Sequence, residues 1–284
     1  MFVCTIATLP IIAYYNGRMP IPFYLVDAFA ERPFTGNPAG VCFPDSAAST
    51  SWLQQVAAEI NQAMTAFLLP RSDGDWDLRW FTPTIEVDIC GHATLASALV
   101  LWKTERVGKP ADETISFHTR SGVLICSRSG ERIEMDFPAE PATSSDDLVL
   151  EALGLQRQPV FVGRNRMDVL VVLETPDEVR AIVPDASRIS TIDARGVIVT
   201  SKSDRPEFDF ISRFFAPRLG ILEDPVTGSA HCCLGPYWQS VLKKDELVGY
   251  QASRRGGVVS VRCETNRVHL GGSAIMILEG RLRS

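Results

Sequence analysis

The sequence predicts an α+β protein of two similar halves, in each of which strands surround one central helix. Three observations lead to this prediction. Strand-like runs bounded by Gly, Pro or Asp occur throughout the chain. A segment rich in Pro, Ser and acidic residues, 139–147, has the composition of a linker between domains. Finally, one long helix is expected in each half, from Gly91 to about Thr104 and from about Thr227 to Leu242, and both begin alike.

The first half is expected to contain mainly strands and one additional helix. That helix is expected over Ser51–Asn61, because Trp52, Val56 and Ile60 recur every four residues and would share one face. A serine at its start is a candidate cap. The strands expected in this half are Phe23–Phe29, Ala39–Phe43, Thr65–Leu69, Leu78–Phe81, Gly122–Ser127 and Arg132–Phe137.

The second half repeats the alternation of strands and turns. We expect an N-terminal domain over 19–140 and a C-terminal domain over 141–284, with the last strand a candidate to pack on the first domain. The strands expected in the second half are Val160–Val162, Asp168–Val172, Gly196–Thr200, Phe208–Phe214 and Val258–Cys263.

Composition and charge exclude several classes of protein. Hydrophobic residues make up 45% and charged residues 22% of the 284 residues, as in ordinary globular proteins. The net charge of −6 lacks the cationic field that a nucleic-acid partner requires. Residues 1–18 are interrupted by polar residues and are too short to span a bilayer, so we expect a leader of doubtful structure, without membrane contact or secretion signal. The seven cysteines form no C-x-x-C pair, which indicates reduced thiols in a cytoplasmic protein.

The two long helices begin in the same way. Glu86–Ala98 and Glu223–Gly235 both pass from acidic residues through a glycine, Gly91 or Gly228, into a helix of small residues. Free N–H groups at a helix start bind anions, and glycine lets a ligand approach them. Two such starts facing one cleft would bind a carboxylate. The alternative interpretation is that both glycines are ordinary turn residues ahead of buried helices.

Two residues beside these glycines could carry proton chemistry. His92 could transfer a proton near neutral pH, and Asp224 could orient or tune it, although both residue types also have common structural roles. A hydrolase built from Ser229, His92 and Asp224 is disfavoured because no G-x-S-x-G motif occurs. A metal site is disfavoured because adjacent residues of a helix point about 100° apart; its candidate ligands would be Cys90, His92, His231, Cys232 and Cys233. Neither G-x-G-x-x-G nor a P-loop is present, so we expect no cofactor.

Six motifs, in order from about Ile21 to the C-terminus, make the chain resemble a known family. The chain is similar to the PhzF-like family of phenazine-biosynthesis proteins. The motifs are Val26–Phe29 with Arg32–Ala39, Arg79–Pro83, Glu86–Ala96, Ser212–Pro217, Glu223–Cys232 and Gln251–Gly257.

This resemblance implies a fold, a reaction and a site. The fold would be diaminopimelate-epimerase-like, with two pseudo-symmetric domains, each a β-barrel around a central helix, and the site between the two helix starts. Family members are cofactor-independent isomerases that move a proton on a small carboxylic acid and commonly form homodimers. His92, Asp224 and Ser229 match polar site residues of the family. Gly91 and Gly228 match the backbone around the bound substrate, and Thr227, next to Gly228, is expected to bind substrate as well.

The chain departs from the family at one important position. The family usually carries Ser-Glu-Thr before Ala-Phe, and that Glu is the proton-transferring base, whereas this chain has Met64 at the Glu position. A thioether cannot transfer a proton. One hypothesis is a relocated base, for which Cys90 is the candidate because a thiol at a helix start can have a lowered pKa. No second thiol lies in the 224–227 turn, which argues against a racemase with two thiols.

Two further hypotheses remain open. The chain could be a catalytically silent protein that binds a small carboxylate in a cleft made more apolar by Met64. Alternatively, His92 with Asp224 could carry out a single-base reaction on a substrate that is already activated for proton loss. Only the enzyme hypotheses predict exchange of substrate protons with solvent.

Overall fold

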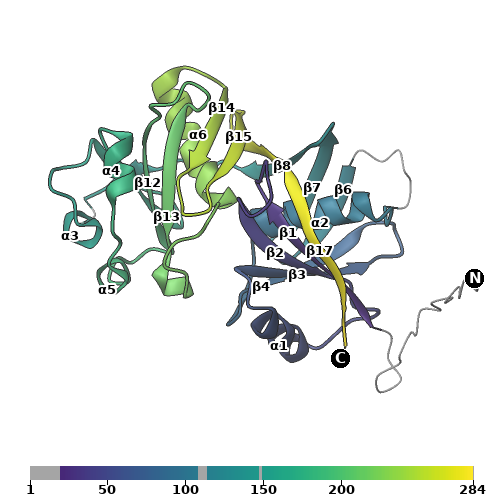
Figure 1. Ribbon diagram of the computed structural model, residues 1–284. Coiled ribbons are helices and arrows are strands. Elements are labelled where there is room, and N and C mark those ends of the chain that lie inside the picture. Colours follow the sequence, from purple (N-terminus) through teal and green to yellow (C-terminus); the bar gives the residue numbers. More distant parts are fainter. Residues whose placement is uncertain (1–19, 108–113, 147–148, 284) are drawn as a thin grey trace, which may run out of the picture.

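The computed structural model describes residues 20–107, 114–146 and 149–283, so the predicted leader 1–18 lies outside the described residues. Two lobes lie side by side, one formed mainly by each half of the chain (Figure 1). Their strands belong to one hydrogen-bonded network of seventeen. Among the described residues, no helix is both long and apolar enough to cross a membrane.

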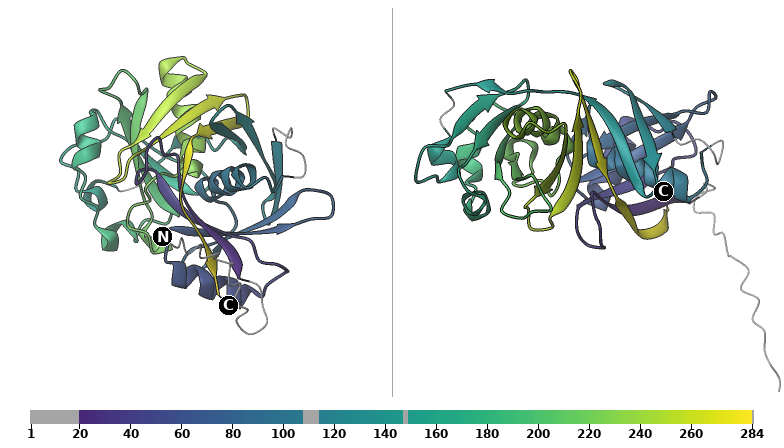
Figure 2. Two further views of the ribbon diagram at one scale, coloured as in Figure 1. Left: turned by 45° about the vertical axis from the view of Figure 1, so that its right-hand side comes forward. Right: turned by 90° about the horizontal axis from the view of Figure 1, so that it is seen from above.

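In the N-terminal lobe, strands wrap around helix α2 (Gly91–Lys103), which Figure 2 shows enclosed within them. Ten of the thirteen residues of α2 are buried, and its small side chains let the surrounding strands approach. Helix α1 (Thr50–Ile60) lies outside these strands. The strands are β1 (Ile21–Ala28), β2 (Asn37–Cys42), β3 (Met64–Pro70), β4 (Trp76–Phe81), β5 (Glu86–Val87), β6 (Thr114–Thr119), β7 (Gly122–Ser129) and β8 (Arg132–Pro138).

The C-terminal lobe repeats this arrangement around helix α6 (Gly228–Leu242). The short helices α3 (Leu150–Leu153), α4 (Pro176–Ala181), α5 (Ala186–Ile189) and η1 (Pro217–Leu219) lie outside its strands. The strands are β9 (Thr143–Ser144), β10 (Phe161–Arg164), β11 (Asp168–Val172), β12 (Gly196–Lys202), β13 (Phe210–Phe215), β14 (Glu246–Gln251), β15 (Gly257–Cys263) and β16 (Arg267–Gly272).

The lobes are joined by the last two strands. β16 pairs antiparallel with β8, and β17 (Ala274–Leu282) returns to the N-terminal lobe, where it pairs antiparallel with β1 from Ile21↔Leu282 to Ala28↔Ala274. The chain therefore crosses between the lobes near 139–146 and again between β16 and β17.

Two residues of α6 explain how it fits its surroundings. A Cβ on Gly235 would lie 2.8 Å from Val261 Cγ1, so only glycine lets β15 pack this closely. Pro236 cannot donate to the Cys232 carbonyl as a helical N–H would. That carbonyl instead accepts from the Glu140 backbone N–H at 3.0 Å, which attaches the segment after β8 to the helix.

The predicted long helices agree with α2 and α6 to within one residue at each end. The helix predicted over Ser51–Asn61 begins one residue earlier, because Ser49 is its cap and accepts from the Trp52 N–H at 3.2 Å. Asn61 is not helical: it ends α1 in the left-handed conformation, with φ of 53°. The residue bounds of several strands were not predicted, among them those of β6, β14, β16 and β17.

Candidate functional site

A cavity of about 590 Å³ lies where α2 and α6 begin, between the lobes. A Cβ on Gly91 would lie only 3.3 Å from the Cα of Gly228, so the two helix starts face each other almost in contact. All eight residues expected at the site line this cavity: Met64, Cys90, Gly91, His92, Asp224, Thr227, Gly228 and Ser229. The structure therefore brings together residues from both halves.

Neither helix start is closed by the side chain of its own cap residue. Cys90 and Thr227 occupy the cap positions with extended backbones, and neither side chain makes a capping hydrogen bond within the described structure. The Thr227 hydroxyl instead donates to Asp224 Oδ2 at 2.6 Å. The positive ends of both helix dipoles consequently remain directed at the cavity, where they favour an anionic group.

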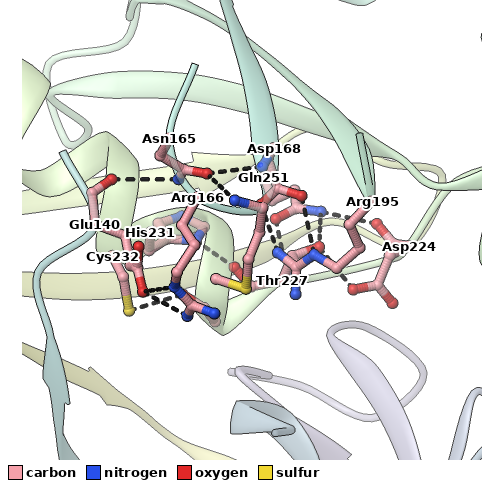
Figure 3. Close-up of polar contacts among 12 residues, drawn as sticks. Glu140, Asn165, Arg166, Asp168, Arg195, Asp224, Thr227, His231, Cys232 and Gln251 are labelled. Atoms are coloured by element: carbon pink, nitrogen blue, oxygen red, sulfur yellow. Dashed lines mark hydrogen bonds and ion pairs between the residues drawn. The ribbon is translucent and has the colours of Figure 1, made fainter. Parts of the chain in front are cut away.

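Asp224 is buried and tightly held. Its Oδ1 accepts from Asn37 Nδ2 at 2.8 Å, and its backbone carbonyl accepts from Gln251 Nε2 at 2.7 Å. Gln251 Oε1 also accepts from the Thr227 N–H at 2.8 Å, so one glutamine fixes both ends of the turn before α6 (Figure 3). Each carboxylate oxygen accepts one hydrogen bond from these partners and retains a further lone pair.

His92 lies on the other side of this network. Its Nδ1 is 3.2 Å from Asn37 Nδ2 and 3.5 Å from Cys90 Sγ. Burial lowers the pKa of the His92 imidazole below its ordinary value, and the charge of Asp224 opposes this only in part. The imidazole is therefore neutral at pH 7 and can take part in hydrogen bonding as a neutral group.

The expectation of a reactive thiol at Cys90 is wrong. Burial raises the pKa of Cys90 to about 12, and nearby Asp224 raises it further. The N–H groups of Ala93 and His92 lower the pKa, as a helix start should, but by less than burial raises it. Cys90 is thus a neutral thiol at neutral pH.

Met64 begins β3, opposite Ala39 of β2, and is 7% exposed. Its side chain is one of the apolar groups that line the cavity, as are those of Leu124 and Phe137. Ser229, one residue after Gly228, is half-buried in the cavity wall. Position 64 therefore presents an apolar group to the cavity.

Three residues of the site were not predicted. Asn37 and Gln251 lie in the motifs Arg32–Ala39 and Gln251–Gly257, and membership of these motifs is the sequence signal that could have identified them. Arg195 belongs to no motif. It lines the cavity between Asp168 and Asp224 (Figure 3), and its Nε and Nη2 donate to the two oxygens of Asp168 at 2.9 and 2.5 Å.

The chain is similar to known proteins over most of its length. The family described as phenazine biosynthesis-like protein (PhzC-PhzF) matches residues 26–280. An uncharacterized isomerase from Halalkalibacterium halodurans is 49% identical over 265 residues, covering 93% of this chain and 99% of the relative. A crystal structure of a PhzF-family protein from Enterococcus faecalis superposes with a TM-score of 0.86 at 40% identity, covering 93% of this chain and 99% of that chain.

The fold alone is shared more widely. A hydroxyproline epimerase from Agrobacterium vitis superposes with a TM-score of 0.60 at 8% identity, over 92% of each chain. The predicted fold, two similar lobes of strands around a central helix in the manner of the epimerases, is thereby confirmed. Taken with the family match over nearly the whole chain, these likenesses show that the chain belongs to the phenazine biosynthesis-like (PhzC-PhzF) family.

Proposed function

We propose that this chain is an isomerase that moves a proton on a small carboxylic acid without a cofactor, using Asp224 and His92. One observation carries the proposal: a buried carboxylate, a neutral imidazole and two open helix starts converge in one cavity. The family match and the isomerase names of relatives favour this class of reaction.

The carboxylate of the substrate would bind at the helix starts and at Arg195. Arg195 uses Nε and Nη2 for Asp168, which leaves the N–H groups of Nη1 as donors for a ligand. Its guanidinium lies 5.4 Å from the ring centre of Phe214, which also lines the cavity. Asp168 is fully buried, so Arg195 is held in a fixed orientation.

Asp224 would be the base. A free lone pair of its carboxylate takes a proton from carbon, the C–H electron pair forms a new double bond, and the existing double bond shifts by one position. The same carboxyl group returns the proton to the carbon at the far end of the shifted system, so that atoms and charge balance. Between the two proton transfers, negative charge develops on an oxygen atom of the substrate. His92 would stabilise this charge by donating a hydrogen bond.

Met64 determines what kind of substrate this mechanism can use. Without the glutamate of relatives, one carboxylate must both remove and return the proton, which requires a C–H bond already acidified by neighbouring unsaturation. Cys90 is not proposed as base, since its thiol stays protonated at neutral pH. The predicted homodimer and cytoplasmic location remain expectations from the family resemblance and the cysteines.

A second candidate function is a silent carboxylate-binding protein, and the apolar side chain of Met64 in the cavity is the observation that favours it. Proton NMR in D₂O with a panel of small unsaturated and amino carboxylic acids separates the two. The isomerase predicts deuterium uptake that falls at least about 10²-fold in Asp224→Asn. Asp193→Asn is the matched control, because that side chain is 99% exposed and should leave uptake unchanged.

Line broadening of an acid without deuterium uptake would reject the isomerase and support the binding protein. Uptake that persists in Asp224→Asn but disappears in His92→Gln would show that the base has been assigned to the wrong residue.

A further inference from the structure

Asn37 is the residue through which His92 and Asp224 are connected. It is the first residue of β2, is fully buried, and does not itself line the cavity. The preceding Gly36 has φ of +68°, and a Cβ there would lie 2.2 Å from the Ala28 carbonyl oxygen. Only glycine permits this turn, and the turn places the Asn37 side chain between the two lobes.

The C-terminal lobe fixes the same turn from its other side. Arg255 donates to the carbonyls of Gly36 and Thr35, at 2.8 and 3.0 Å, and to Asp27 Oδ1 at 2.7 Å. Asn37 is therefore positioned by residues of both lobes before any contact of its own side chain is considered.

The partners of Asn37 determine its orientation. Its Nδ2 lies 2.8 Å from Asp224 Oδ1, 2.8 Å from the Val226 carbonyl oxygen and 3.2 Å from His92 Nδ1. A carboxylate and a backbone carbonyl can only accept, so the amide must present its N–H₂ group to them. The N–H₂ group has two protons for three neighbours, so one N–H is shared with the longer contact to His92 Nδ1, and that nitrogen is then an acceptor without a proton.

Among the described residues, the opposite end of the amide makes no hydrogen bond that competes for its orientation. Asn37 Oδ1 is buried and has no hydrogen-bond partner within the described part of the chain. The three contacts of Nδ2 alone hold the side chain in place, and they offset the unfavourable burial of a carbonyl oxygen without a partner.

We propose that Asn37 is a positioning residue that selects one tautomer of His92. With Nδ1 unprotonated, the single proton of the neutral imidazole is on Nε2, and this is the proton that His92 can donate. The same amide group attaches this imidazole, from the N-terminal lobe, to the carboxylate of the C-terminal lobe. The catalytic consequence rests on the proposed function, whereas the tautomer itself does not.

His231 provides a reference within the same molecule. Its Nδ1 lies 2.8 Å from the Thr227 carbonyl oxygen, which can only accept, so His231 must carry its proton on Nδ1. The two buried histidines at the starts of α2 and α6 should therefore be opposite tautomers.

The test is ¹⁵N NMR of the imidazole rings, which is practical because the chain has only four histidines. In the unmodified protein above the ordinary histidine pKa, we expect an unprotonated shift for His92 Nδ1 and a protonated shift for His231 Nδ1. Asn37→Ala should bring the two His92 shifts toward their average, and Asn37→Asp should move the proton to Nδ1. Asn266→Ala, on an exposed turn, is the control and should change neither.

A protonated Nδ1 on His92 in the unmodified protein overturns the proposal, whatever the variants do. Unchanged His92 shifts in a folded Asn37→Ala protein overturn it as well. If an exchanging acid is found, Asn37→Ala should also lower kcat by at least about tenfold. Absence of any exchange would reject the proposed function, while the ring shifts would still decide the tautomer.

Discussion

The segments that lead into α2 and α6 share one framework but supply different chemistry. In each, a strand arginine holds a glutamate five residues before the glycine: Arg79 binds Glu86 at 2.7 and 2.8 Å, and Arg213 binds Glu223 at 2.7 and 3.0 Å. Both pairs are bidentate, the geometry that fixes a backbone best.

The difference lies in the residues between the glutamate and the glycine. In the C-terminal lobe this segment contributes Asp224, which is buried in the cavity. In the N-terminal lobe Val87 occupies the position of Asp224, and the next residue, Asp88, lines the cavity with a side chain that is 71% exposed, beside Cys90 and His92. One framework thus supplies a buried carboxylate from one lobe and a buried imidazole from the other. The acids of the N-terminal lobe that line the cavity are either paired, as Glu86 is with Arg79, or largely exposed, as Asp88 is.

The largest expected effect comes from making the lobes more alike. Met64→Glu would place a second carboxylate in the cavity, contributed by the lobe that has no buried and unpaired carboxylate there. It should raise deuterium uptake by about 10²- to 10⁴-fold, the usual contribution of a general base. Uptake is measured by proton NMR in D₂O. Met64→Gln, which matches the size without an ionisable group, should give no increase.

A folded Met64→Glu protein that shows no gain with any acid of the panel would argue against a latent two-base site. In that case the cavity would be specialised for a single base or for binding.

The two arginine pairs should differ in their contribution to stability. Arg213 is only 10% exposed and also donates to the Ile182 carbonyl at 2.7 Å, just after α4, whereas Arg79 is 31% exposed. Arg213→Met should lower the free energy of unfolding by about 3 kcal/mol, because buried partners lose their donor. Arg79→Met should cost about 1 kcal/mol. Urea denaturation measures both, and equal losses would show that burial does not distinguish the pairs.

The first turns of α2 and α6 satisfy the carbonyl of the cap residue differently. Thr94 Oγ1 donates to the Cys90 carbonyl at 2.6 Å, and at the same position in α6 His231 Nδ1 donates to the Thr227 carbonyl. Burial lowers the pKa of His231 to about 4. Only α6 therefore has an ionisable group at this position.

This pKa is lower in the folded than in the unfolded chain. The free energy of unfolding is therefore highest above the ordinary pKa near 6.5, and it falls as the pH drops from there toward 4. The loss due to His231 should reach about 3 kcal/mol. His231→Thr copies the N-terminal lobe, and its free energy of unfolding, measured by urea denaturation, should fall less across this pH range. Some dependence on pH should remain, because the pKa of His92 is also lowered. An unchanged slope would contradict the assignment to His231.

The smallest effect concerns a helix outside the site. Ser49 caps α1, unlike the cap residues of α2 and α6, and Ser49→Ala should lower the free energy of unfolding by about 1 kcal/mol. It should leave the affinity for any bound acid unchanged, as measured by ligand line broadening. A change in that affinity would indicate coupling between α1 and the cavity.

The sequence predicted the features that depend on local pattern. The small residues after Gly91 and Gly228 marked both central helices, and the run Asp168–Val172 was predicted at the bounds it has as β11. β16 was missed because its end, Gly271–Gly272, reads as a turn, although both glycines are buried in the strand.

Contacts between distant residues could not be predicted in this way. Asn37 meets His92 and Asp224 across 55 and 187 positions of sequence, and no periodicity records such a contact. For Cys90, the pattern showed the helix dipole but not the depth of burial, so the direction of its pKa shift was predicted wrongly.

The return of β17 to β1 has a consequence for how the protein is made on the ribosome. Ile21 pairs with Leu282, so one of the first strands to leave the exit tunnel waits for one of the last. The strands around α6 up to β16 precede β17 in the chain and can assemble while β1 still lacks this partner. The C-terminal lobe can therefore form before the N-terminal lobe is complete, the reverse of the order of synthesis.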